Sequence, residues 1–144
     1  VFNELNLIKL KKLSGLSKLH RHSFAFEFRD QSWFDNLNVI KLFQMHSWIL
    51  VIVNSTNIAN LSNGFNPRLN SYVPTSNLLY FRLHGTTGKY TGPYKNYILN
   101  QIKKLIFDIR PKISLIYFNN TDSGDAWPNA FKLKSKFNYL NTRI

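Results

Sequence analysis

The sequence contains no cysteine, few acidic residues and no long apolar run. Without cysteine the chain can form neither a disulfide nor a thiolate metal site, and catalysis by a thiol is excluded. Its longest uninterrupted apolar segment, residues 48–53, has six residues, whereas a membrane-spanning helix needs about 20. We therefore expect a cytoplasmic protein that has no membrane partner.

What the sequence does contain is enough apolar material for a packed core. Of its 144 residues, 44% are hydrophobic and 15% are aromatic, which excludes a disordered chain. Nineteen Lys and Arg stand against seven Asp and Glu, for a net charge of +12. Asn and Lys are frequent beside Ile, Leu and Phe, a bias typical of A+T-rich coding sequences, so part of this charge reflects composition. Weak, non-specific association with nucleic acid is expected at low salt.

Hydrophobic periodicity predicts alternating strands and helices. Strands are predicted at residues 23–30, 48–53, 78–84 and 113–119. Helices are predicted at residues 2–16, 34–43, 98–105 and 126–140. Residues 55–77, rich in Asn, Ser, Gly and Pro, are predicted to form a loop in place of a helix. This order indicates an α/β fold with a parallel sheet.

The two faces of the predicted strands differ in a way that favours a barrel over an open sheet. In the first strand Phe24 and Phe26 alternate with Glu27 and Arg29, and the third strand repeats this contrast. An outer face packed on helices and a partly polar lumen would produce that pattern.

Polar side chains follow the predicted strands at their carboxyl ends, where parallel α/β folds bind ligands. The candidate ligand-binding residues are Asn54, Arg29, Arg82, Asn119, Asn120, Tyr80 and Tyr117. Arginine and asparagine suit a small anionic or hydroxylated ligand, because they provide forked donors and paired amide groups. The asparagines could equally bind loop backbone, and the tyrosines could simply fill the lumen.

Two residues are candidates for catalysis. His84 precedes Gly85 at a strand end, where glycine allows a ligand to approach, which favours a general acid–base or ligand-binding role. The alternative for His84 is a structural histidine whose hydrogen bonds are satisfied within the fold. Glu27 is a tentative catalytic partner. The alternative for Glu27 and Arg29 is a structural ion pair.

No cofactor is indicated by the sequence. It has no glycine-rich loop of the P-loop or dinucleotide type and no Gly-x-Ser-x-Gly nucleophile motif. His20 and His22 form a close pair without a third ligand nearby, so no metal site is predicted.

Three segments resemble one family. FAFEFRDQSW at 24–33, YFRLHG at 80–85 and YFNNT at 117–121, followed by Asn129 and Ala130, are similar to the YecE-like family, domain of unknown function 72. The resemblance implies a TIM-type barrel of which residues 1–144 form a single partial domain, the C-terminal half with about four parallel βα units. The motifs expected in the N-terminal half of that family are absent.

The resemblance predicts the fold more firmly than the function. Its leading implication is that the full barrel binds or transforms a small polar or anionic ligand at the mouth, as a hydrolase or isomerase could. A nucleic-acid-binding or nucleic-acid-processing protein is one alternative, and a truncated inactive fragment is the other. For the half-barrel we expect a partner, either the missing N-terminal half or a second copy, because open strand edges favour pairing.

Overall fold

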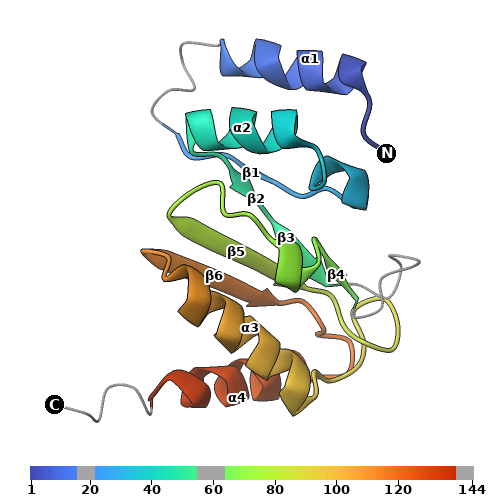
Figure 1. Cartoon of the computed structure of the whole chain (residues 1–144). Helices are drawn as coiled ribbons and strands as arrows, with labels where there is room; N and C mark the ends of the chain where they lie inside the picture. The colour runs from blue at the N-terminus through green and yellow to red at the C-terminus, as the bar shows by residue number, and fades with distance from the viewer. Residues whose placement is uncertain (16–21, 55–63, 139–144) are drawn as a thin grey trace, which may run out of the picture.

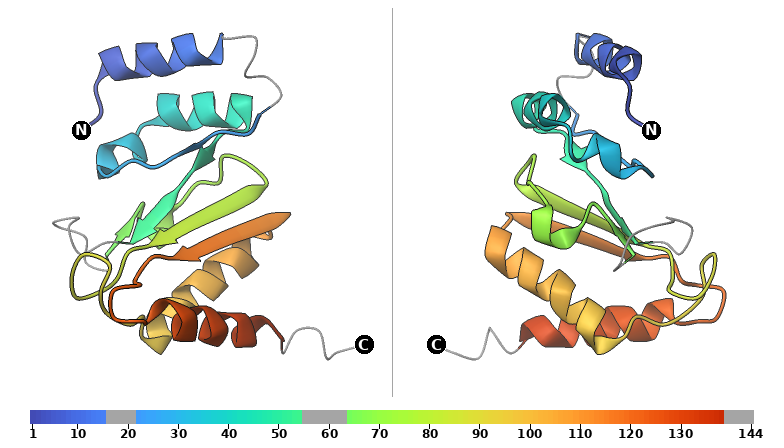
Figure 2. Two further views of the ribbon diagram at one scale, coloured as in Figure 1. Left: turned by 180° about the vertical axis from the view of Figure 1, so that it is seen from behind. Right: turned by 45° about the vertical axis from the view of Figure 1, so that its right-hand side comes forward.

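The computed structural model describes residues 1–15, 22–54 and 64–138. The helices are α1 (Glu4–Ser14), α2 (Leu37–His46), α3 (Asn96–Ile109) and α4 (Ala126–Asn138), with two 3-10 turns, η2 (Gln31–Trp33) and η3 (Leu69–Ser71). The strands are β1 (Ala25–Phe26), β2 (Ile49–Leu50), β3 (Ile52–Asn54), β4 (Phe65–Asn66), β5 (Leu78–Leu83) and β6 (Ile113–Phe118). Figures 1 and 2 show α1 and α2 at one end of the molecule, α3 and α4 at the other, and the strands between them.

The strands confirm the predicted parallel α/β fold. β1 pairs in parallel with β2, and a second sheet has the order β4-β3-β5-β6, in which β3–β5 and β5–β6 are parallel. Only Val51 separates β2 from β3, so one extended segment pairs with β1 on one side and β5 on the other. The four predicted strands therefore lie side by side in chain order.

Alternate residues of β5 and β6 point to opposite faces of the sheet, as in any strand. Leu79, Phe81 and Leu83 are fully buried on one face, which we call the helix-covered face. The other, which we call the open face, carries Tyr80 and Arg82 of β5, in register with Leu115 and Tyr117 of β6. This confirms the predicted contrast between the two faces of the third strand.

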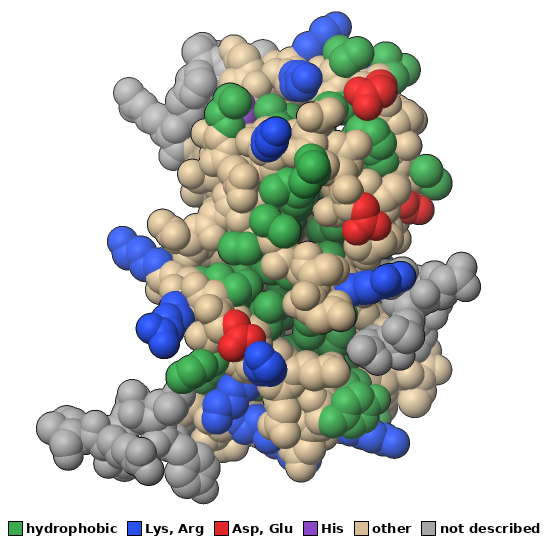
Figure 3. Space-filling view, in the orientation of Figure 1, with side chains coloured by type: hydrophobic (Ala, Val, Ile, Leu, Met, Phe, Trp, Pro, Cys, Tyr) green, Lys and Arg blue, Asp and Glu red, His purple; other side chains and the backbone are tan. Residues whose placement is uncertain are grey.

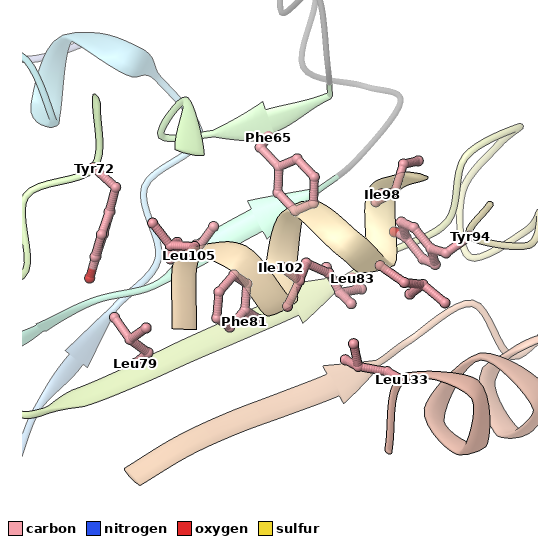
Figure 4. Packing of buried hydrophobic residues seen from close by; sticks show 12 residues of the cluster. Phe65, Tyr72, Leu79, Phe81, Leu83, Tyr94, Ile98, Ile102, Leu105 and Leu133 are labelled. Carbon is pink, nitrogen blue, oxygen red and sulfur yellow. The ribbon is translucent and has the colours of Figure 1, made fainter. Parts of the chain in front are cut away.

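The helix-covered face packs mainly against α3. Leu99 and Ile102 of α3 are fully buried with Phe81, because apolar residues recur on one side of the helix at a spacing of three and four. Figure 4 shows Phe81 and Ile102 between β5 and α3, and Leu133 of α4 belongs to the same cluster.

A second core lies between α1, α2 and β1 and is mostly aromatic. Phe43 of α2 is fully buried against Phe26, with ring centroids 5.1 Å apart. Phe28 stacks on Trp33 at 4.1 Å. Both helices begin with an asparagine whose side chain accepts a backbone N–H of the first turn, Asn3 for α1 and Asn36 for α2.

Three sequence predictions need correction. The first strand was expected over residues 23–30, but only Ala25–Phe26 pairs, because the chain turns into η2 where the Asp30 side chain accepts the Ser32 N–H. The segment at 48–53 divides into β2 and β3. The loop predicted at 55–77 contains β4, which pairs antiparallel with β3. Parts of three predictions lie outside the described residues: residue 16 of the first predicted helix, residues 139–140 of the last one, and residue 20 of the histidine pair.

Candidate functional site

The candidate site lies on the open face, near the carboxyl ends of β1 and β5. Glu27 follows β1 directly, and its carboxylate reaches across to Arg82 of β5. Its Oε2 accepts a hydrogen bond from Arg82 Nη1 at 2.7 Å, and its Oε1 lies 2.5 Å from Arg29 Nη2. Three of the predicted site residues therefore form one cluster, which we call the mouth cluster together with His84.

The mouth cluster carries a net positive charge, because two guanidinium groups face one carboxylate. The Glu27 side chain is only 16% exposed, whereas those of Arg82 and Arg29 are 36% and 55% exposed. The carboxylate thus forms the base of the cluster, and the two arginines remain within reach of solvent. Each guanidinium has five N–H donors, more than a single carboxylate can accept, so donors remain for a ligand.

His84 lies at the inner side of this cluster. It is 4% exposed, and its Nε2 is 3.9 Å from Glu27 Oε1. Burial lowers the pKa of the imidazole below its ordinary 6.5; Glu27 opposes this change, while Arg29 and Arg82 add to it. His84 is therefore neutral at pH 7. Its Nε2 has no hydrogen-bond partner among the described residues.

Tyr80 and Tyr117 lie beside the cluster on the open face. Their rings are 5.4 Å apart between centroids, and Tyr117 is 51% exposed. The two tyrosines form an aromatic wall adjacent to Arg82, since Tyr117 is the register partner of that residue.

Asn54 lies elsewhere, on the helix-covered face. It is the register partner of Leu83, and its Oδ1 accepts a hydrogen bond from the Tyr94 hydroxyl at 2.8 Å. The same hydroxyl accepts the Gly85 N–H at 2.8 Å, so Asn54 helps to hold the chain that follows His84. Burial raises the pKa of Tyr94 well above its ordinary 10, so the phenol stays protonated.

Asn119 and Asn120 follow β6 and differ in their contacts. Asn120 is fully buried, and its Nδ2 donates to Gly92 O and to Asn129 Oδ1, each at 3.0 Å. Both partners are oxygen atoms, so the amide nitrogen of Asn120 must face them and its Oδ1 makes neither bond. In the described part of the chain, neither Asn120 Oδ1 nor the buried Oδ1 of Asn119 has a hydrogen-bond partner.

Asn66 is a site residue that the sequence did not reveal. It pairs with Val53, whose partner on the other side is Arg82, so Asn66 lies on the open face. It is fully buried, its Nδ2 donates to Phe28 O at 3.1 Å, and its Oδ1 has no partner within the described ranges. It precedes Pro67 in a segment without periodicity, so only the pairing of β4 with β3 brings it to the site.

Comparison with known proteins identifies a family that matches this chain. A model of the family described as "Protein of unknown function DUF72" matches residues 3–143. This chain belongs to the DUF72 family. No curated protein matches it.

Two crystal structures of DUF72 family proteins resemble it. One, from Thermotoga maritima, is 25% identical with a TM-score of 0.73, and the match covers 95% of this chain and 53% of that one. The other, from Enterococcus faecalis, is 22% identical with a TM-score of 0.71 and coverages of 95% and 54%. The chain thus spans about half the length of these DUF72 proteins.

In residues 1–15, 22–54 and 64–138 no three His, Asp or Glu side chains are placed to hold a metal ion. No helix in those ranges is long and apolar enough to cross a membrane. Lys and Arg side chains are spread from end to end of the face in Figure 3.

Proposed function

We propose that this DUF72 chain forms half of a TIM-type barrel and binds a small polar anion at the mouth cluster. The single observation that carries the proposal is the cluster itself: Glu27 lies between two arginines, and the buried His84 is 3.9 Å away. The cluster lies near the carboxyl ends of parallel strands, and α/β folds bind their ligands at this end of the sheet.

The half-barrel is supported by the strand order and the chain length. Four parallel segments lie in chain order, as consecutive βα units do in a barrel, and the match covers 53% of the Thermotoga maritima chain. On the open face of β6, Ile113, Leu115 and Tyr117 are 48%, 36% and 51% exposed. In a closed barrel such side chains fill the lumen. The partner we propose is therefore the rest of the barrel, and residues 1–144 are a partial domain.

An anion is the ligand that the charges favour. Arg82 and Arg29 present a planar fork of donors, which matches the oxygens of a phosphate or carboxylate, and Glu27 restrains both guanidinium groups. Tyr80 and Tyr117 would border the ligand on one side. The free buried oxygens of Asn66 and Asn119 would accept hydrogen bonds from its hydroxyl groups or from water bound with it. Asn120 would act indirectly, because its side chain is engaged with Gly92 and Asn129 on the helix side of the sheet.

In this proposal His84 exchanges a proton with the bound ligand. A neutral imidazole near pH 7 can accept a proton, and Glu27 would stabilise the imidazolium that results. Asn54 and Tyr94 act indirectly, because their hydrogen bonds fix the backbone at Gly85 next to His84.

The test is a titration of the isolated chain with inorganic phosphate, followed by NMR. We expect phosphate to shift the backbone signals of Glu27, Arg29 and Arg82, and Arg82→Gln to weaken the affinity about tenfold, since a charge-assisted hydrogen bond contributes about 1.5–3 kcal/mol. The matched control is Arg68→Gln. Arg68 is exposed and belongs to a groove beside α3, on the helix side of the sheet.

Equal affinity in wild type and Arg82→Gln would contradict the assignment of the mouth cluster. Phosphate shifts confined to Lys and Arg outside the cluster would contradict it as well, because they would indicate non-specific binding driven by net charge.

A further inference from the structure

The loop that follows β5 holds a tyrosine in an unusual backbone conformation. Tyr90 has φ = +61°, in the left-handed region that a bulky side chain rarely adopts. Non-glycine residues in this region cost free energy and persist where the surrounding structure imposes them, often at functional sites.

Hydrogen bonds on both sides hold Tyr90 in this conformation. The backbone N–H groups of Thr86 and Thr87 both donate to Thr91 O, at 2.9 and 3.2 Å, which closes the loop. On the other side, Asp122 N donates to Tyr90 O at 3.2 Å and ties the loop to the segment after β6. The tyrosine is thus fixed from β5 and from β6 at once.

The ring of Tyr90 lies against the imidazole of His84. Their centroids are 5.5 Å apart, with an angle of 52° between the rings. The exposed cation Lys89 also lies near this ring, with its Nζ 5.5 Å from the Tyr90 centroid. On the side of Glu27, the Nε2 edge of the imidazole points toward the mouth cluster.

We propose that Tyr90 is a positioning residue: its ring covers one side of His84, excludes solvent there, and leaves the Nε2 edge beside Glu27 as the approach for a ligand. This inference rests on the proposed function only in treating His84 as a site residue. The left-handed backbone is what directs the ring onto the imidazole. The charged groups around His84 are Glu27 and Arg29 from the segment after β1 and Arg82 of β5, with Lys89 near the tyrosine ring.

The test measures how fast diethyl pyrocarbonate modifies His84, with the exposed His22 as internal reference in the same sample. Tyr90→Asn removes the ring but keeps a residue that tolerates the left-handed region, and Tyr90→Phe keeps the ring. We expect His84 to react severalfold faster relative to His22 in Tyr90→Asn, and at the wild-type rate in Tyr90→Phe. Tyr97→Asn, on the exposed side of α3, is the matched control and should leave the ratio unchanged.

A second readout is the pKa of His84 followed by NMR. It should rise toward 6.5 in Tyr90→Asn and stay at the wild-type value in Tyr90→Phe, since burial is the largest cause of the lowered pKa. Tyr90→Gly is the second variant should the asparagine variant not fold. The inference also predicts nuclear Overhauser contacts between the ring protons of Tyr90 and those of His84 in the wild-type chain.

An unchanged His84 reactivity in both the Asn and Gly variants would overturn the inference, as would absence of the ring contacts in the wild-type chain. Neither measurement uses phosphate. Failure here would leave phosphate binding at the mouth cluster standing, and failure of phosphate binding would leave the contact between Tyr90 and His84 standing.

Discussion

The two faces of the β5–β6 sheet differ in the burial and the type of their side chains. On the helix-covered face Leu79, Phe81 and Leu83 are fully buried and contact other apolar side chains. On the open face a carboxylate, two arginines and a histidine meet within a few ångströms, beside exposed tyrosine and leucine. One strand, β5, contributes to both faces. Its residues belong alternately to the apolar core and to the face that carries the charged cluster.

The largest expected effect comes from comparing two adjacent residues of β5. Phe81→Ala should lower the free energy of unfolding by about 3–5 kcal/mol, because it leaves a cavity in the α3 core. Tyr80→Ala, on the open face, should lower it by less than about 1 kcal/mol. Urea unfolding followed by circular dichroism measures both. Equal losses would mean that the open face is packed as a core.

A smaller effect is expected within the mouth cluster. Glu27→Gln removes the charge that both arginines contact, but these arginines reach solvent, so we expect a loss of about 1 kcal/mol or less. The same variant should lower the pKa of His84 further, because Glu27 is the neighbour that raises it. NMR titration of the His84 ring protons measures this change. A higher pKa in Glu27→Gln would contradict the geometry.

The stability of the chain should also depend on pH through His84. Its pKa is lowered by folding, so between that value and 6.5 the unfolded chain binds more protons, and stability falls as the pH is lowered through this window. Hydrogen bonds from Ser32 lower the pKa of Asp30, so this carboxylate affects the stability only at more acidic pH.

The measurement is the urea midpoint at several pH values between 7.5 and 5. The matched variant His84→Gln lacks the titrating group and should show a flatter profile over this range. An identical slope in the two proteins would show that another group is responsible.

The smallest effect on stability is expected at the exposed end of α4. Trp127 and Phe131 are 71% and 56% exposed, and their rings are 4.8 Å apart. Trp127→Ser should change the free energy of unfolding of the monomer by less than about 0.5 kcal/mol. It should reduce self-association in sedimentation experiments, because an exposed aromatic pair favours contact with another chain. Unchanged or stronger association in the variant would contradict this expectation.

Several features could be predicted from the sequence because they depend on spacing along the chain. The alternation of Phe24, Phe26 and Phe28 with Glu27 and Arg29 placed the phenylalanines on one face and the charges on the other, as the structure confirms. Likewise, the pattern of β5 placed Arg82 and His84 on the side away from Phe81.

Other parts of the site could not be predicted, since they depend on contacts between distant segments. Asn66 reaches the open face only through the pairing of β4 with β3. Asn54 appeared equivalent to the other strand-end residues, but its register with Leu83 places it beside Tyr94. The backbone of Tyr90 has no local signal such as glycine, because hydrogen bonds from Thr86, Thr87 and Asp122 impose it. The roles of the site residues in binding and catalysis stay predictions.

By itself the sequence determined the class of fold, the order of the parallel strands and the helices, and which side chains share a face within one strand or helix, because side-chain direction repeats every two residues in a strand and every three or four in a helix. Only the tertiary structure decided that Glu27 meets Arg82 and His84, that Asn66 reaches the same face, and that the Tyr90 ring lies against the imidazole. The physical reason is that those contacts depend on which strands become neighbours and in what register, and pairing of this kind is a property of the folded chain as a whole.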